Sequence, residues 1–530
     1  MSLGTVSLRT GDRLPPLPRA FLEGESLDLL EPIRFVGGPG SEVDSRPADR
    51  GALAGALGVA NAAYGHPRAE SLAERLADPE TRVVVTGQQP GFLGGPLYTL
   101  SKAVAAVRWA GELEARGEPA VAVFWVATED HDYREVANVV VLGTEGPQRL
   151  SLGEDANLLT PVGMRTLGPG VEAALDLARA LHPSDRWAEW MERVAAWYRP
   201  DARFGEAFSR LIVGILGERA PLMLDSMLPE LKTAQRPWLR RLVERRFELG
   251  ELVAERERAI VETGFQPQVK PAPGASPLFL LRGESRRRIQ WIGDGHFGLR
   301  GEPDVREPVE SLLETIEENP SVVSPGVMAR TALQDATLGT GVVILGPGEV
   351  SYMPQVAPVY RLLGIDAPLA ALRPQAIVLP ERQRNWLEGS DLGLADLLEP
   401  LLDLERAVSG GEEDKLIDPI RRRIEAQLEQ LRESALALDR NLEAPWGKTR
   451  QQIERALSAF SGRLAAAAAR RREADFRRLQ DLRTLCLPLG GHQERSLATA
   501  YFPGRFGDRF VEAFFEQLGL EADRLHVISP

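Results

Sequence analysis

The chain has 530 residues, of which 43% are hydrophobic and 26% charged, and its formal net charge is −13. This length exceeds one ordinary hydrophobic core, so we expect several packed units of a soluble globular protein. The sequence has no apolar run that predicts a membrane span and no pattern of a secretory signal, and its acidic balance argues against nucleic acid as a partner. The single cysteine, Cys486, excludes an intrachain disulfide framework and favours a cytoplasmic location.

The first predicted structure is a strand, a glycine-rich loop and a helix in succession. Residues 82–85 (RVVV) form the strand, the loop follows at 87–96, and residues 97–110 have helical spacing. Glycines let the backbone approach a ligand, and the start of the next helix is a seat for phosphate or carboxylate. The loop has neither Walker nor GxGxxG order, so a tight turn without a ligand is the alternative. We predict that it binds substrate or nucleotide through Thr86, Gly87, Gln88, Gln89, Gly91, Gly95, Tyr98 and Lys102.

A second apolar strand, residues 120–126, ends in a cluster of charged residues, and residues 139–142 predict a third strand. Continuous apolar strands alternating with helices indicate a parallel sheet buried on both faces. Ligands of such sheets bind beyond the carboxyl ends of the strands, where both polar motifs lie. The cluster consists of Glu129, Asp130, His131 and Asp132, which we predict to be catalytic.

Three carboxylates around one histidine have two chemical uses. They could orient His131 as a base toward an amine, or Asp130 and Asp132 could transiently hold Mg²⁺ beside nucleotide phosphates. Helix capping by Asp132 would explain one carboxylate but not all three. No histidine or cysteine stands at the spacing of a zinc site.

The sheet pattern is interrupted twice. Residues 145–200 are mostly helical, and residues 221–225 (PLMLD) return to the sheet. Residues 235–320 then combine a charged helix at 240–263 with short strand-like pieces at 278–281 and 289–292. Residues 341–345 (GVVIL) resume the sheet, and a second glycine loop follows. Its predicted binding residues are Gly346, Gly348, Glu349, Tyr352 and Gln355.

The last large segment predicts an antiparallel pair of long helices. Eight apolar residues from Ile417 to Leu442 follow spacings close to a heptad seam. We expect Pro445-Trp446-Gly447 to break this helix before a second one with Ile453 and Phe460 on its apolar face. Such a stripe is typical of packing within the hairpin or across a dimer.

Four segments together resemble the cysteine ligase family of bacillithiol biosynthesis. TGQQPGFLGGPLYTLSK (86–102) is similar to that family's T-G-Q-Q-x-G-x-x-x-G-P-x-Y-x-x-x-K signature at every fixed position. FWVATEDHDYREV (124–136) and GPGEVSYMPQVAPVY (346–360) resemble two further blocks, and residues 488–495 match a P-x-G-x-x-Q-E-R pattern. The chain departs from the family pattern at Gly326, Thr331 and Gly339.

The resemblance implies an α/β fold with a Rossmann-like parallel-sheet core similar to class I aminoacyl-tRNA synthetases. It also implies two connecting-peptide insertions and a helical coiled coil that forms a homodimer. We therefore divide the chain into core segments at 1–144, 205–234 and 323–375, insertions at 145–204 and 235–322, a coiled-coil domain at 376–484 and a returning segment at 485–530.

The activity implied by the resemblance is a ligase that adds L-cysteine to glucosaminyl-malate to form bacillithiol. ATP with Mg²⁺ is the expected cosubstrate, and no tightly bound cofactor is expected. One alternative is a nucleotidyl or aminoacyl transferase that acts on another amine. Another is a dimeric nucleotide-binding scaffold, which would have no reason to maintain the costly cluster at 129–132.

Overall fold

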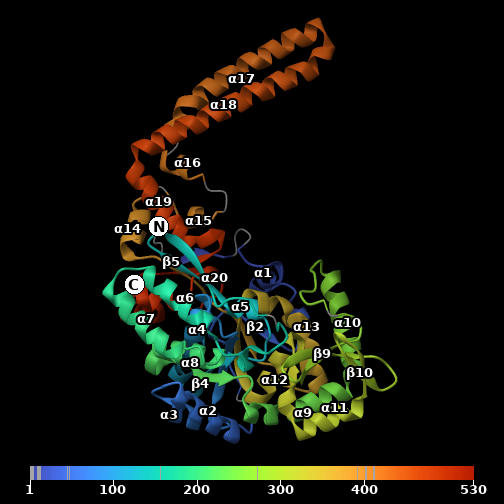
Figure 1. Cartoon of the computed structure of the whole chain (residues 1–530). Coiled ribbons are helices and arrows are strands. Elements are labelled where there is room, and N and C mark those ends of the chain that lie inside the picture. The colour runs from blue at the N-terminus through green and yellow to red at the C-terminus, as the bar shows by residue number, and fades with distance from the viewer. Residues whose placement is uncertain are drawn as a thin grey trace. The chain divides into compact units, whose positions relative to one another are not determined.

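The apolar runs predicted as strands at 82–85, 120–126, 221–225 and 341–345 lie in one six-stranded sheet of the computed structural model (Figure 1). The structure describes residues 5–8, 13–44, 46, 48–155, 157–270, 272–390, 392–399, 403–409 and 412–530. Every neighbouring pair in this sheet is parallel, which confirms the predicted fold class. The strands, in spatial order, are β2 (Arg34–Val36), β14 (Leu369–Leu372), β13 (Thr340–Leu345), β3 (Arg82–Gln88), β4 (Ala120–Val126) and β7 (Leu222–Asp225).

Helices cover both faces of this sheet. On one face α4 (Tyr98–Ala115) packs Trp109 and Leu113 against alternate residues of the strands. On the other face α2 (Gly51–Ala63) and α3 (Ala69–Ala77) pack against the remaining strand residues. Because both faces are covered, β4 is buried along its whole length, which explains its continuous apolar sequence.

The predicted third strand at 139–142 is a strand, but it does not join the main sheet. Residues Asn138–Gly143 (β5) pair antiparallel with Gly146–Ser151 (β6) in a separate two-stranded sheet. Only two residues separate the strands, and a connection of this length pairs each strand with its immediate neighbour. Helices α6 (Gly170–Ala180) and α7 (Asp185–Trp197) follow.

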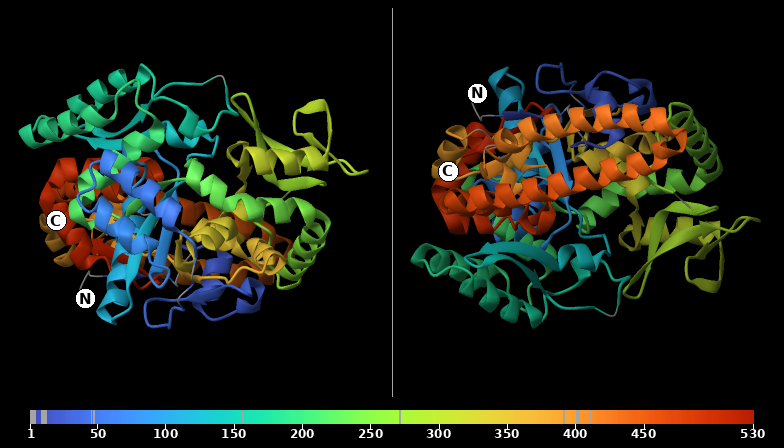
Figure 2. Two further views of the ribbon diagram at one scale, coloured as in Figure 1. Left: turned by 90° about the horizontal axis from the view of Figure 1, so that it is seen from below. Right: turned by 90° about the horizontal axis from the view of Figure 1, so that it is seen from above.

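The second interruption contains two helices where the sequence predicted one charged helix at 240–263. They are α9 (Pro229–Glu244) and α10 (Arg246–Glu262), which meet at Arg245. The predicted short strands are confirmed within a five-stranded antiparallel sheet, and Figure 2 shows this region as a lobe separate from α6 and α7. Its strands, in spatial order, are β11 (Glu302–Pro308), β10 (His296–Leu299), β9 (Ser285–Trp291), β8 (Ala275–Arg282) and β12 (Val323–Pro325).

Residues near the C-terminus return to the core. Strand β16 (Arg524–Ile528) pairs with β15 (Gln375–Val378), and the Gln493 side chain accepts a 2.6 Å hydrogen bond from the N–H of Val378. The compact unit that contains the main sheet therefore combines Gly4–Pro380 with Gln493–Pro530, and a second unit is built on Glu381–His492.

The second unit contains the predicted helical hairpin, formed by α17 (Glu412–Leu438) and α18 (Glu443–Arg471) (Figure 1). The helix break predicted at 445–447 lies instead at the short turn Arg440–Leu442. Pro445 stands in the first turn of α18, where its missing N–H has no helical acceptor to lose. In the parts of the chain that the structure describes, no helix has both the length and the apolarity to cross a membrane.

Candidate functional site

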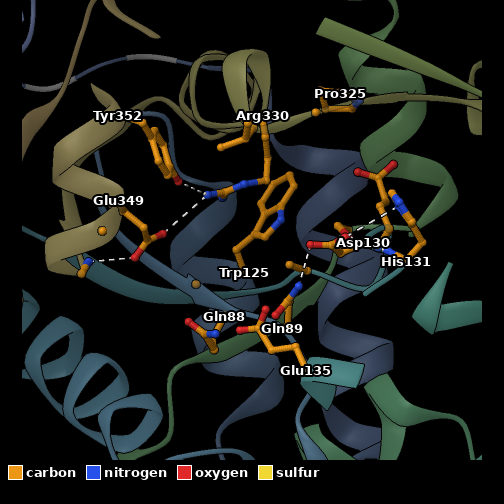
Figure 3. Close-up of a pocket in the computed structure, with 18 of the residues that line it drawn as sticks. Gln88, Gln89, Trp125, Asp130, His131, Glu135, Pro325, Arg330, Glu349 and Tyr352 are labelled. Carbon is orange, nitrogen blue, oxygen red and sulfur yellow. Dashed lines mark hydrogen bonds and ion pairs between the residues drawn. The ribbon is translucent and has the colours of Figure 1, made fainter. Parts of the chain in front are cut away.

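A pocket of about 730 Å³ opens at the carboxyl ends of β3 and β4. Figure 3 shows Glu349, Tyr352 and Arg330 grouped on one side of it and Asp130 and His131 on the other. The structure brings twelve of the predicted site residues together as its lining: Gly87, Gln88, Gln89, Tyr98, Lys102, Glu129, Asp130, His131, Gly346, Gly348, Glu349 and Tyr352.

The other five predicted site residues lie outside this lining. Thr86 donates a 2.9 Å hydrogen bond to Ile344 O and so joins β3 to β13. Asp132 caps the short helix α5 (Tyr133–Val136) by accepting the N–H of Glu135 at 3.2 Å. Gln355 binds the backbone of Val269 through both its amide atoms, at 2.8 and 2.7 Å. Gly91 and Gly95 pack against each other, so that a Cβ on Gly91 would lie 2.7 Å from the Cα of Gly95.

Backbone N–H groups at the start of α4, just after the glycine loop, are hydrogen-bonded within the protein. The N–H of Leu97 donates to Leu497 O at 3.0 Å, and the N–H of Thr99 donates to Pro96 O at 2.9 Å. These are two of the backbone donors that the predicted phosphate or carboxylate seat would use. The loop therefore contributes to the pocket mainly through its side chains, and less through free N–H groups at the start of α4.

Lys102 is buried beneath the loop. Its ammonium donates to Gly87 O at 2.7 Å, to Gln88 Oε1 at 3.2 Å and to the carboxylate of Glu349. An ammonium has three N–H donors, and all three have acceptors within the protein. Burial lowers the pKa of Lys102, against the opposing attraction of Glu349. Lys102 thus holds the loop to Glu349.

Glu349 is the centre of this side of the pocket. Beside its ion pair with Lys102, it lies 3.6 Å from Arg330 and accepts the N–H of Gly346 at 2.7 Å. Burial acts to raise the pKa of Glu349, but the attraction of Lys102 and Arg330 outweighs it, and the pKa lies below its ordinary value. The carboxylate is therefore charged, and it keeps Arg330 at the pocket wall 3.4 Å from the Tyr352 hydroxyl.

The carboxylates of the charged cluster do not surround His131 as the sequence suggested. Glu129 forms a buried ion pair with Lys232. Asp130 accepts Gln89 Nε2 at 2.6 Å and the backbone N–H of His131 at 2.7 Å, and its Oδ1 lies 3.8 Å from His131 Nδ1. That separation exceeds hydrogen-bond length, so each carboxylate binds a partner other than the imidazole.

The imidazole of His131 instead contacts Arg286, whose Nη1 lies 3.2 Å from His131 Nδ1. Burial and Arg286 both lower the pKa of His131, whereas Asp130 and Asp132 act to raise it. The net direction is downward, so the imidazole is neutral near pH 7.

Several lining residues were missed by sequence reasoning. Glu135, Arg286, Arg288 and Arg373 line the pocket, and so does Arg495. Arg286 and Arg288 belong to an arginine run whose alternation along a strand would have placed both on one face. Arg373 had no local signal, because its partner Glu494 is 121 residues away. Glu494 accepts hydrogen bonds from Nη1 and Nη2 of Arg373 at 2.9 and 2.7 Å.

A metal site is not evident in the described part of the chain, which has no group of three or more histidine, cysteine or acidic residues placed to hold an ion. The magnesium contact predicted for Asp130 and Asp132 therefore stays a prediction that depends on nucleotide phosphates supplying other ligands.

Comparison with known proteins gives the family. The model of the N-terminal Rossmann-like domain of the bacillithiol biosynthesis protein BshC matches residues 40–374, and that of its C-terminal coiled-coil domain matches residues 376–529. The chain belongs to the BshC family. Membership confirms the resemblance drawn from the four motif segments and makes the chain a member of a family of ligases.

Three similar relatives carry the name "Putative cysteine ligase BshC". The Salinibacter ruber protein is 33% identical over 493 residues, which cover 91% of this chain and 89% of the relative. The Solibacter usitatus protein is 30% identical over 90% of this chain and 89% of the relative. The Geobacillus thermodenitrificans protein is 27% identical over 83% of this chain and 82% of the relative.

Proposed function

We propose that the chain joins the carboxylate of L-cysteine to the amine of glucosaminyl-malate, with ATP and Mg²⁺ as cosubstrate, and so forms bacillithiol. The names of the relatives supply cysteine, and the description of the family supplies bacillithiol biosynthesis. Glucosaminyl-malate and ATP follow from the resemblance and from the chemistry, because a free carboxylate does not condense with an amine without activation.

The charge of the pocket is the observation that carries the proposal. Its lining has six lysine and arginine side chains and four acidic ones, although the whole chain has a net charge of −13. A basic surplus in one cavity of an acidic protein favours anionic ligands. Both the malyl carboxylates of the proposed acceptor and the phosphates of ATP are of this kind.

The basic and acidic side chains are unevenly placed. Arg330 lies on the side of Glu349 and Tyr352, and Arg495 adds a further cation to the lining. Arginine binds carboxylate and phosphate through two parallel hydrogen bonds. We assign an anionic group of the substrates to Arg330 and Arg495, beside the N-terminal end of α13 (Pro347–Leu363) where Gly348 lines the pocket.

The opposite side is suited to the amine. Gln89 bonds Asp130 there, and Glu135 lies beside them in Figure 3. Burial raises the pKa of Glu135, and Asp132 and Asp130 act in the same direction. A carboxylate with a raised pKa is a competent proton acceptor for an amine that loses its proton on attack. The sequence assigned to His131 the steering or deprotonation of this amine.

The chemistry has two steps. A cysteine carboxylate oxygen attacks a phosphorus of ATP, which gives an acyl adenylate and pyrophosphate or an acyl phosphate and ADP. The amine nitrogen then forms a bond to the acyl carbon, the acyl C–O bond breaks with its electron pair on the departing phosphate, and a proton leaves the nitrogen. Holding both substrates in one pocket supplies the proximity that this second step needs.

We also propose that the chain is a cytoplasmic homodimer whose partner contact lies on the helical hairpin. Large apolar side chains on α17 and α18 are exposed in the single chain, among them Ile420, Leu431 and Phe460. Exposed apolar residues at near-heptad spacing are what a second helix pair would cover.

Incubation of the purified protein with glucosaminyl-malate, cysteine and ATP·Mg²⁺ tests the ligase. Mass spectrometry should detect bacillithiol together with AMP or ADP, and the nucleotide product distinguishes the two activation routes. Product should require all three substrates and should fall sharply for His131→Ala. Absence of product, under conditions in which calorimetry shows both substrates binding, would refute the proposal.

A further inference from the structure

Arg286 reaches the pocket from the antiparallel sheet of the second interruption and is fixed there by its surroundings. Its Nε donates to Ser324 Oγ at 2.8 Å, and its Nη2 donates to Pro325 O at 2.9 Å. Its guanidinium carbon lies 3.8 Å from the centroid of the Phe279 ring. The side chain is 6% exposed, so its position is set by packing and hydrogen bonds on three sides.

The remaining arm of this guanidinium faces His131. Nη1 of Arg286 lies 3.2 Å from Nδ1 of His131, and the Phe279 ring also lies beside the imidazole, with ring centroids 6.0 Å apart. An arginine side chain has five N–H donors and no acceptor. The hydrogen bond therefore has only one possible direction, from Arg286 to an unprotonated Nδ1.

This direction decides where the proton of the imidazole is. A neutral imidazole with an unprotonated Nδ1 carries its proton on Nε2. Nε2 is then a hydrogen-bond donor and has no lone pair with which to accept a proton. Asp130 does not reverse the assignment, because its nearer oxygen is 3.8 Å from Nδ1 and accepts the backbone N–H of His131 instead.

We propose that Arg286 is a positioning residue that holds His131 as the neutral Nε2–H tautomer, so that His131 donates a hydrogen bond to the acyl oxygen of the activated cysteine. Only the hydrogen bond from His131 to the acyl oxygen rests on the proposed ligase function; the tautomer does not. Negative charge develops on that oxygen when the amine nitrogen bonds to the acyl carbon. The C=O bond re-forms, and the charge on the oxygen is lost, when the C–O bond to phosphate breaks. A donor aimed at such an oxygen stabilises the transition state.

This role differs from the base predicted for His131 and changes where the amine proton goes. With Nδ1 occupied by Arg286 and Nε2 protonated, the amine proton passes to a carboxylate on the side of the pocket where Asp130 and His131 lie (Figure 3). Asp130 and Glu135 are the lining carboxylates that are not in an ion pair with lysine or arginine among the described residues. The second interruption thus supplies a part of the active site, through Arg286.

The tautomer can be measured on the free protein labelled with ¹⁵N-histidine. Two-bond ¹H–¹⁵N correlation spectra distinguish the two neutral tautomers and the charged imidazole, and the signal of His131 is assigned by its loss in His131→Gln. At pH 7.5 we expect the Nε2–H tautomer in the wild-type chain and a mixture in Arg286→Met. Arg287→Met is the matched control, since Arg287 stands on the other face of β9 and pairs with Glu302. A protonated Nδ1 in the wild-type protein would overturn the proposal.

Kinetics test the catalytic consequence. Loss of one donor to a developing oxyanion lowers kcat by about 10²-fold, so Arg286→Met should do so with little change in KM, and Arg287→Met should match the wild type. Because Arg286 acts through His131, the double variant Arg286→Met/His131→Ala should be no slower than His131→Ala alone. Multiplicative effects would contradict the positioning role. Since the spectra need no turnover, an inactive wild-type protein with the Nε2–H tautomer would refute the ligase but not the tautomer assignment.

Discussion

Lys102 and Glu349 form an ion pair at the floor of the pocket, although 247 residues separate them in the chain. The pair joins the segment of the first glycine loop, after β3, to the first turn of α13. These are the two glycine-rich segments that the sequence predicted to bind substrate or nucleotide. The geometry of the pair gives Lys102 no free donor for a ligand, so its contribution is to hold the two segments together.

Removal of one partner of this pair should destabilise the core. Lys102→Met leaves the Glu349 carboxylate without its nearest cation, and breaking a buried ion pair in this way costs about 3–5 kcal/mol. Urea unfolding followed by tryptophan fluorescence measures the loss. The double variant Lys102→Met/Glu349→Gln should be more stable than the sum of the single effects predicts. Arg306→Met, which removes an exposed pair with Asp294, is the control and should leave the midpoint unchanged. A Lys102→Met midpoint equal to that of the control would contradict the prediction.

Asp335 should make the protein less stable as the pH rises from 4 to 7. Burial raises its pKa to about 6, while hydrogen bonds from Tyr360, Thr340 and Gln334 act in the other direction. The folded state therefore binds this proton more tightly than the unfolded state, and the stability it contributes below pH 4 is lost as the pH passes 6. The loss is on the order of 2–3 kcal/mol for a shift of this size.

The comparison of wild-type protein with Asp335→Asn isolates this group. The variant cannot ionise, so its free energy of unfolding should rise relative to the wild type between pH 4 and pH 7. Parallel pH profiles for the two proteins would show that the pKa of Asp335 is the same in the folded and unfolded states, and would contradict the prediction. Asp366→Asn, at a carboxyl whose side chain is not part of this hydrogen-bond cluster, serves as the control.

Arg495 should affect substrate affinity more than turnover. Its side chain lines the pocket, and none of the described residues forms an ion pair with it. A charged hydrogen bond to a carboxylate or phosphate is worth about 1.5–3 kcal/mol, so Arg495→Met should raise one KM about 10- to 100-fold. Steady-state kinetics with each substrate varied in turn identifies the anionic group concerned. Arg509→Met, on an exposed face of α22 (Asp508–Gln517), should behave as the wild type. Equal KM values for Arg495→Met and wild type would remove Arg495 from the proposed binding site.

The helical hairpin should control oligomeric state. Leu431 and Phe460 are 58% and 53% exposed, and a buried glutamate at either position would oppose association. Sedimentation velocity over a range of concentrations should show a dimer for the wild type and a shift toward monomer for Leu431→Glu and Phe460→Glu. Gln430→Glu adds the same charge at a neighbouring polar position and should leave the dimer intact. A wild-type protein that sediments as a monomer would exclude the proposed contact.

The fold was largely predictable because its signals are local. The unbroken apolar run of β4 needs a sheet covered on both sides, and glycines 87, 91 and 95 mark a tight loop at its neighbour β3. The helical hairpin was readable from apolar spacing alone, although Pro445 misplaced its turn. A proline in the first turn of a helix and a proline that ends one look alike in sequence.

The pocket was only partly predictable, because half of its chemistry depends on pairing between distant residues. The cluster at 129–132 suggested carboxylates around a histidine. In the structure Glu129 forms an ion pair with Lys232, 103 residues away, and His131 is hydrogen-bonded to Arg286, 155 residues away. Lys232 carries no motif of its own, and the arginine run that contains Arg286 does not indicate that it meets His131. Which residue a charged group will meet is set by tertiary packing, and local spacing does not contain that information.

The Arg373–Glu494 pair also constrains the order in which the molecule can be completed. Arg373 precedes the helical unit in the chain and Glu494 follows it, so a ribosome must synthesise all of 381–492 before the buried guanidinium can find its carboxylate. Until then β15 also lacks β16, and Arg495 is missing from the pocket. A nascent chain that has already formed the main sheet therefore still presents an unfinished site. The candidate site is complete only when the last segment has folded back.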